Sequence, residues 1–187
     1  VLPGKISSIA WNISTISGTT TYPNFTIKMK CTNVQDLTNT AFDNTGLTQV
    51  FFSPNINITA GWNTYTFPTA YEWDGVSNIV VDLRMTEFYG SANATTYYTS
   101  TSNNSVLYAY ATSSNSSFWT SSPVPTTSVN RPNITFDGQV VSYGSGSYNW
   151  SWNNGGGTGN VVTVNPTTTT TYTVTAQDPT TLCTSTG

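Results

Sequence analysis

Histidine is absent from this chain of 187 residues, and charged residues make up only 7% of it. Globular proteins usually carry about 25% charged side chains, so hydroxyl and amide groups must cover much of this surface. Serine and threonine fill 59 positions and asparagine another 20. The missing histidine excludes a Ser-His-Asp triad within the chain, and we predict a protein that is not an enzyme and has no cofactor.

Basic residues are equally scarce, since five Lys and Arg stand against eight Asp and Glu. Such a chain has no polybasic face for nucleic acid or anionic lipid. No apolar run approaches the ~20 residues of a membrane span. We therefore expect no nucleic-acid partner and no membrane insertion. The opening residues 1–4 do not resemble the start of a signal peptide, so we predict a mature or excised fragment.

Aromatic residues, by contrast, are plentiful at 13%, which excludes disorder by composition. Period-2 alternation is clear along the chain: Phe25, Ile27 and Met29 interleave with Thr26 and Lys28. β-branched residues, which suit a pleated sheet, occur throughout. Further strands are expected at 9–13, 47–52, 62–67, 79–85, 95–99, 106–111 and 132–136. The fold class is all-β.

Turn signals separate the expected strands, at residues 44–46, 53–55, 74–75 and 137–138. Many short strands with regular turns favour a jelly-roll-like β-sandwich. After Asp137-Gly138 the composition shifts to a glycine-serine stretch and a compact pattern of three or four strands, fewer than the ~7 of an Ig-like sandwich. We predict a jelly-roll-like β-sandwich over 1–137 and a partial Ig-like β-sandwich over 138–187.

Several longer motifs follow one another in order. In the first part they are Gly4-Lys5-Ile6-Ser7-Ser8-Ile9-Ala10-Trp11-Asn12, Asn24-Phe25-Thr26-Ile27-Lys28-Met29, Gly61-Trp62-Asn63-Thr64-Tyr65, Trp73-Asp74-Gly75-Val76-Ser77-Asn78-Ile79-Val80-Val81 and Ser128-Val129-Asn130-Arg131-Pro132-Asn133-Ile134-Thr135-Phe136. In the second part they are Trp152-Asn153-Asn154-Gly155-Gly156-Gly157-Thr158-Gly159-Asn160 and residues 166–176. The first set resembles a β-sandwich repeat of very large secreted surface proteins of the Bacteroidetes group, and the second is similar to the Ig-like (PKD-like) repeats of the same proteins.

This resemblance implies export by the type IX route and a role as a cell-surface adhesin, gliding adhesin or extracellular filament. Such repeats are not themselves enzymes, although they also accompany secreted hydrolases as accessory modules. Two departures stand out. Family members have a further strand before Gly4, and their Ig-like repeats often pair a late cysteine, matching Cys183, with one near their first strand, where residues 138–147 hold none. Both departures predict a fragment, or a subunit whose missing strands come from a neighbouring copy.

The two cysteines, Cys31 and Cys183, lie far apart in the sequence, without a CxxC motif or a histidine. A zinc site therefore has almost no ligands to use, and we expect no metal. A disulfide in an oxidising compartment and a pair of unpaired buried thiols are both compatible with this pattern.

Asn-x-Ser/Thr sequons are candidate sites of N-glycosylation, as in a secreted glycoprotein. The eight are Asn12, Asn24, Asn57, Asn93, Asn103, Asn115, Asn133 and Asn149. Twenty asparagines with a hydroxyl residue at about a third of positions would give roughly six such patterns by chance. Their number therefore does not distinguish glycan acceptors from composition.

Trp73-Asp74-Gly75 is either a ligand rim, with an indole that stacks on a sugar beside a carboxylate, or a turn before the strand at 79–85. We favour the turn, because Asp accepts backbone hydrogen bonds and Gly adopts positive φ. Glu72 and Asp74 alone are too few ligands for calcium. With Asp82 and Glu87 they form the densest carboxylate set, but their spacing does not distinguish a glycosidase-type pair from solvated acids.

An aromatic-rich stretch is the last candidate surface, and its residues are Tyr97, Tyr98, Tyr108, Tyr110, Phe118 and Trp119. Exposed, it would serve adhesion or sugar stacking; we favour inward packing for the alternating Tyr108 and Tyr110. Taken together, the sequence predicts an extracellular or cell-surface structural and adhesive module that contacts neighbouring copies and surface glycans. The alternative is a carbohydrate-binding accessory module of a secreted hydrolase.

Overall fold

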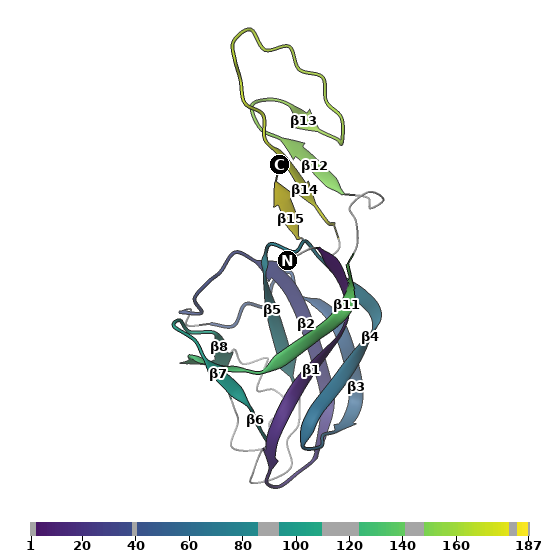
Figure 1. Ribbon diagram of the computed structural model, residues 1–187, viewed down its shortest axis with the longest axis vertical. Helices are drawn as coiled ribbons and strands as arrows, with labels where there is room; N and C mark the ends of the chain where they lie inside the picture. The colour runs from purple at the N-terminus through teal and green to yellow at the C-terminus, as the bar shows by residue number, and fades with distance from the viewer. Residues whose placement is uncertain are drawn as a thin grey trace.

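The computed structural model describes residues 3–38, 41–85, 94–109, 124–140, 148–179 and 183–186, and the regular elements in these ranges are β-strands. The predicted all-β fold is therefore confirmed. Two antiparallel sheets face each other as a β-sandwich, and a further sheet projects from one end of it (Figure 1). Within the described ranges, no helix has the length and apolar character needed to cross a membrane.

The first sheet of the sandwich has the strand order β11-β1-β4, and β6 pairs with the last residues of β1. Its strands are β1 (Gly4–Ile16), β4 (Gly61–Trp73), β6 (Ala94–Thr96) and β11 (Ile134–Val140). The second sheet has the order β3-β2-β5. Its strands are β2 (Thr21–Thr32), β3 (Thr48–Asn57) and β5 (Asn78–Arg84). Each pairing in both sheets is antiparallel.

Two short ribbons and the projecting sheet complete the fold. The ribbons pair β7 (Tyr98–Ser100) with β10 (Asn130–Pro132), and β8 (Val106–Tyr108) with β9 (Thr126–Ser128). The projecting sheet has the order β13-β12-β14-β15, with strands β12 (Asn149–Trp152), β13 (Gly157–Thr158), β14 (Val174–Gln177) and β15 (Thr184–Thr186). We call it the C-terminal sheet. The partial Ig-like β-sandwich predicted for residues 138–187 stays a prediction.

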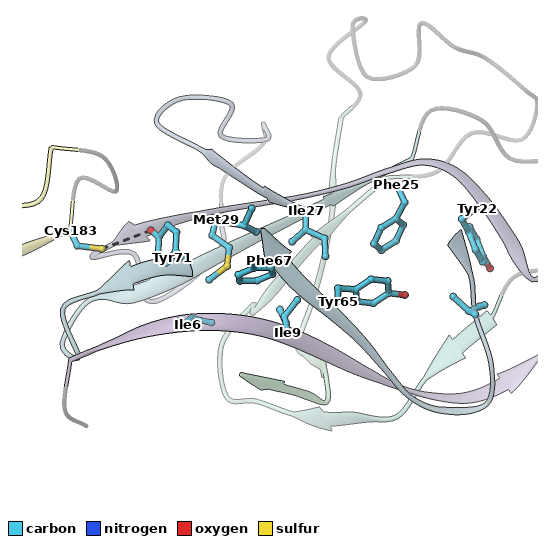
Figure 2. Close-up of a cluster of buried hydrophobic side chains, with 12 residues drawn as sticks. Ile6, Ile9, Tyr22, Phe25, Ile27, Met29, Tyr65, Phe67, Tyr71 and Cys183 are labelled. Carbon is cyan, nitrogen blue, oxygen red and sulfur yellow. Dashed lines mark hydrogen bonds between the residues drawn. The ribbon is translucent and has the colours of Figure 1, made fainter. Parts of the chain in front are cut away.

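The core lies between the two sheets and follows the alternation of the sequence. Ile27 and Met29 of β2 are fully buried, and Phe25 is 4% exposed, whereas Thr26 and Lys28 lie on the other face. Phe25 stacks on Tyr65 of the facing sheet with ring centroids 5.0 Å apart. Figure 2 shows these side chains meeting between the strands. The apolar face expected for residues 25–31 is therefore confirmed.

Alkaline pH is expected to destabilise the sandwich because its core contains buried tyrosines. Burial raises the pKa of Tyr65 to about 12, and burial also raises the pKa of Tyr71. An unfolded tyrosine ionises near pH 10, so the unfolded state loses its proton first and stability falls as the pH rises from about 10 towards 12. We expect the urea midpoint to fall across this range, and Tyr65→Phe to flatten the fall. The exposed Tyr98→Phe serves as the control and leaves the profile unchanged; an equal flattening by both variants would contradict the prediction.

A β-bulge in β1 lets both Ile6 and Ile9 reach the core. Ile6 and Ile9 are three residues apart, and strict alternation would place them on opposite faces. The register of β1 shifts between Ile6 and Ser8 against both β4 and β11, and both isoleucines are buried. Gly138 of β11 pairs with Ile6 at this point, where a Cβ atom would overlap the Lys5 carbonyl oxygen. The bulge therefore requires glycine at this position.

Two of the predicted turns are wrong. Residues 53–55 lie inside β3, whose Pro54 is tolerated because β3 is a terminal strand that pairs only with β2 in the described part of the chain. Asp137 and Gly138 lie inside β11, where the glycine serves the bulge rather than a turn. The strand continues to Val140, so it runs across the proposed division at 137/138, which stays a prediction.

Candidate functional site

Cys31 and Cys183 form a disulfide, with their Cα atoms 5.2 Å apart. The bond joins the end of β2 to the residue before β15, so it fastens the C-terminal sheet to the sandwich. Of the two interpretations that the sequence left open, unpaired thiols and a disulfide, the structure has the disulfide. Sequence reasoning had no means of choosing, because the two residues are 152 positions apart.

The disulfide lies in a buried polar setting at the junction of the sandwich and the C-terminal sheet. The Tyr71 hydroxyl donates to it and lies 3.7 Å from Cys31 Sγ and 3.8 Å from Cys183 Sγ. Figure 2 shows the contact between Tyr71 and Cys183. A carboxylate oxygen of Asp74 lies within 4.8 Å of both sulfur atoms. Cysteine binds metal ions as a thiolate and not as a disulfide. The bonded Cys31 and Cys183 therefore favour a structural cross-link over a metal site with Asp74.

Asp74 and Gly75 lie in a tight turn between β4 and β5, directly after Trp73, the last residue of β4. Asp74 is 7% exposed and accepts hydrogen bonds from the Val76 and Ser77 amides at 2.9 and 2.8 Å and from Ser77 Oγ at 2.5 Å. Trp73 Nε1 donates to the Ser77 carbonyl at 2.8 Å, and Gly75 has φ of 78°. These contacts are those of the turn that we favoured over a ligand rim.

Removing the Asp74 carboxylate is expected to destabilise the junction. Asp74→Ala leaves two amides and a hydroxyl without this acceptor in a buried place, and we expect the free energy of unfolding to fall by about 1–3 kcal/mol. Asp74→Asn keeps one side-chain oxygen, so its free energy of unfolding should lie between those of Asp74→Ala and the wild type. The exposed Asp137→Ala provides the control, with a change within about 0.5 kcal/mol. Urea unfolding measures all three, and equal losses for Asp74→Ala and Asp137→Ala would rule out this role.

Charged groups from the sandwich and the C-terminal sheet meet beside the disulfide. Lys5 Nζ lies 2.7 Å from Glu72 Oε1, and this hydrogen bond and charge raise the pKa of Lys5. Tyr148 and Asp178, from the segments that border the C-terminal sheet, also act on Lys5. Burial raises the pKa of Tyr148, and the negative charges of Glu72 and Asp178 raise it further. Lys5 at the start of β1 and Glu72 at the end of β4 are therefore close enough to Tyr148 and Asp178 for their charges to interact.

The candidate carboxylates do not share one partner. Glu72 pairs with Lys5, Asp74 holds its own turn, and Asp82 pairs with Arg84 of the second sheet at 2.7 Å. Glu87 lies outside the described residues. The structure thus gives the three described acids separate structural contacts, and the absence of catalysis stays a prediction.

The sequons are distributed over the sandwich and the C-terminal sheet. Asn57 and Asn149 are exposed; Asn12, Asn24, Asn103 and Asn133 are half-buried; Asn93 and Asn115 lie outside the described residues. Asn103 Nδ2 donates to the Gln35 carbonyl at 2.7 Å and so ties two loops together. Exposure makes Asn57 and Asn149 the most accessible of the described candidates.

Exposed aromatic rings lie on the strand surfaces. Tyr97 and Tyr98 are 53% and 58% exposed, and Trp62 of β4 is 51% exposed. Tyr108 is 43% exposed, so the inward packing predicted for it is wrong; its strand β8 pairs with β9 in a two-stranded ribbon. Tyr110, Phe118 and Trp119 lie outside the described part of the chain.

An open cleft of about 1910 Å³ lies between the two sheets. It is lined by β5 and β11, which in the described ranges pair only with β2 and β1, respectively, and also by β8 and by residues of the segments 34–37, 41–43 and 103–105. The apolar side chains that line it from β5 and β11 are Ile79, Val81, Leu83, Ile134 and Phe136. Sequence reasoning missed this cleft, because alternation identifies the inner face of a strand but not whether another element covers it.

Comparison with known proteins finds no matching family model, no matching curated protein and no matching solved structure. The resemblance to Bacteroidetes surface repeats therefore rests on the sequence motifs alone and stays a prediction.

Proposed function

We propose that this chain is a non-enzymatic extracellular module with a structural and adhesive role. It is a segment of a cell-surface adhesin or a subunit of an extracellular filament, in which a strand from a neighbouring copy completes the sandwich. The observation that supports this most is the cleft between β5 and β11. Each of these strands offers one unpaired edge in the described structure, and apolar side chains line the space between them.

An added strand satisfies both requirements of such a cleft. Its backbone pairs with an open edge, and its alternate side chains fill the apolar space. Phe136 marks the place: it is 39% exposed, although it pairs with the fully buried Ile9 and so lies on the inner side of β11. A strand laid beside β11 would cover this ring.

The surface chemistry and the disulfide support an extracellular location. Charged residues are only 7% of the chain, and its hydroxyl and amide groups stay uncharged at any moderate pH. Disulfides persist in oxidising compartments, which fits the Cys31–Cys183 bond. Weak contacts from such modules add up through multivalency when many copies are linked.

Electron microscopy of the native material tests the proposal, together with one matched pair of variants. We expect filaments or strings of modules from the wild type, and we expect Phe136→Lys to abolish them by placing a charge in the cleft. Phe52→Lys places the same charge on a ring that is 52% exposed on the outer face of the second sheet, and it should assemble normally. Isolated particles from the wild type, or equal assembly of both variants, would overturn completion by a neighbouring strand.

The second candidate, a carbohydrate-binding accessory module, is favoured by the exposed rings of Trp62, Tyr97 and Tyr98. Such rings stack on sugar faces and keep a polar group for hydrogen bonds. Calorimetric titration with oligosaccharides would measure it, and binding that is lost in Trp62→Ala but kept in Phe52→Ala would favour this candidate.

A further inference from the structure

The Cys31–Cys183 disulfide closes most of the chain into one covalent loop. The two residues are 152 positions apart, so nearly every strand after β2 lies inside the loop. Outside it are β1, β2 and the short strand β15. A force applied at the two ends of the chain passes from β2 through the disulfide to residue 183, because a covalent bond is the shortest connection between them.

The two points at which such a force enters and leaves lie at the same end of the sandwich. Gly4 and Lys5 pair with Trp73 and Glu72 of β4. Cys183 Sγ lies 3.5 Å from the carbonyl oxygen of Glu72. Figure 1 shows the N-terminus at the junction between the sandwich and the C-terminal sheet, where β15 also begins. The direct path between these two points therefore does not run along the length of the sandwich.

We infer that the disulfide is a mechanical stop that keeps residues 32–182 out of the path of tension. Under load, β1 separates from β4 and β11, starting with the rungs at Gly4 and Lys5, and β2 follows as far as Cys31. Extension then halts at the disulfide. In the second sheet, β2 detaches no further than Cys31. The C-terminal sheet stays attached to the sandwich through the disulfide.

The disulfide limits the extension of the chain to a definite length. At about 3.3–3.6 Å per extended residue, the roughly 35 residues outside the loop extend to about 120 Å. The loop of 152 positions hides a further ~500–550 Å. Reduction releases this hidden length when dithiothreitol transfers two electrons and two protons, so that the S–S bond becomes two thiols and the reagent closes into its cyclic disulfide.

Single-molecule force spectroscopy of the whole chain, held at its two ends, tests the inference. We expect the oxidised protein to extend by about 120 Å at most, and to gain ~500–550 Å when dithiothreitol is added to the same stretched molecules. The variant Cys31→Ser/Cys183→Ser should show the full extension without reductant. If this variant does not fold, the same full extension can be measured on wild-type molecules that folded with the disulfide and were then reduced.

Full extension of the oxidised protein would overturn the inference, and so would a short extension that persists after both thiols have been shown to be free. Tyr71→Phe, which keeps the disulfide and removes its hydroxyl neighbour, should behave as the wild type. The benefit of the stop rests on the proposed function, because only a load-bearing module is stretched. The measurement uses single molecules, so a loss of filaments under the microscope leaves its outcome unchanged and the two failures are distinguishable.

Discussion

Replacing Cys31 and Cys183 by alanine is expected to lower the free energy of unfolding by about 2–5 kcal/mol, with the loss near the upper value. A cross-link lowers the conformational entropy of the unfolded chain, and this effect grows with the logarithm of loop length. The loop here spans 152 positions, for which the chain-entropy relation gives about 5 kcal/mol. Urea unfolding followed by tryptophan fluorescence measures the change.

Two comparisons separate the covalent bond from its surroundings. The reduced wild type should lose as much stability as the alanine variant, because both lack the cross-link. Tyr71→Phe removes the hydroxyl that contacts both sulfur atoms but keeps the bond, so its loss should be only about 0.5–1.5 kcal/mol. If the alanine variant keeps the urea midpoint of the wild type, the disulfide does not stabilise the fold.

This disulfide also marks the limit of what the sequence predicts. The alternation at residues 25–31 depends on near neighbours, and it correctly predicted a strand with one buried face. Pairing of Cys31 with Cys183 depends on how β2, β4 and the C-terminal segment come together. Nothing in the local pattern at either cysteine records that arrangement, so the two alternatives stayed open until the structure was known.

Irregularities in strand register also cannot be predicted from this sequence, for a different reason. Strict period 2 assigns Ile6 and Ile9 to opposite faces, and the bulge between Ile6 and Ser8 brings both into the core. Gly138 was predicted as part of a turn, whereas it makes room for the bulge from the neighbouring strand. Glycine suits a turn and a close backbone approach equally well, and the sequence alone does not show which applies.

The exposure of side chains on the predicted strands is the third property that the sequence does not determine. The alternation around Tyr108 correctly indicated a strand, β8, but Tyr108 is 43% exposed, and in the described part of the chain β8 pairs only with β9. Likewise, strands were expected at 79–85 and 132–136, whereas the cleft between β5 and β11 depends on the terminal positions that these strands have in their sheets in the described ranges. The candidate site was thus predictable as residues but not as an arrangement.

Phe25→Ala is the second change with a large expected effect, because Phe25 joins the two sheets through aromatic contacts. Its ring stacks on Tyr65 of the first sheet at 5.0 Å and meets Phe51 of its own sheet edge-on at 6.3 Å. Truncation removes the buried ring and leaves a cavity between the sheets, and we expect the free energy of unfolding to fall by about 3–5 kcal/mol. Urea unfolding monitored by circular dichroism measures the loss.

Phe52→Ala is the matched control, since it makes the same chemical change on the neighbouring strand. Phe52 pairs with Thr26, lies on the outer face of the same sheet and is 52% exposed, whereas Phe25 is 4% exposed. We expect Phe52→Ala to change stability by only about 0.5 kcal/mol. If Phe25→Ala does not fold, Phe25→Leu, which retains most of the volume, should fold with a loss of about 1–1.5 kcal/mol. Equal losses for the two alanine variants would mean that the two sheets do not pack face to face at Phe25, because burial between them is the property that distinguishes this ring from Phe52.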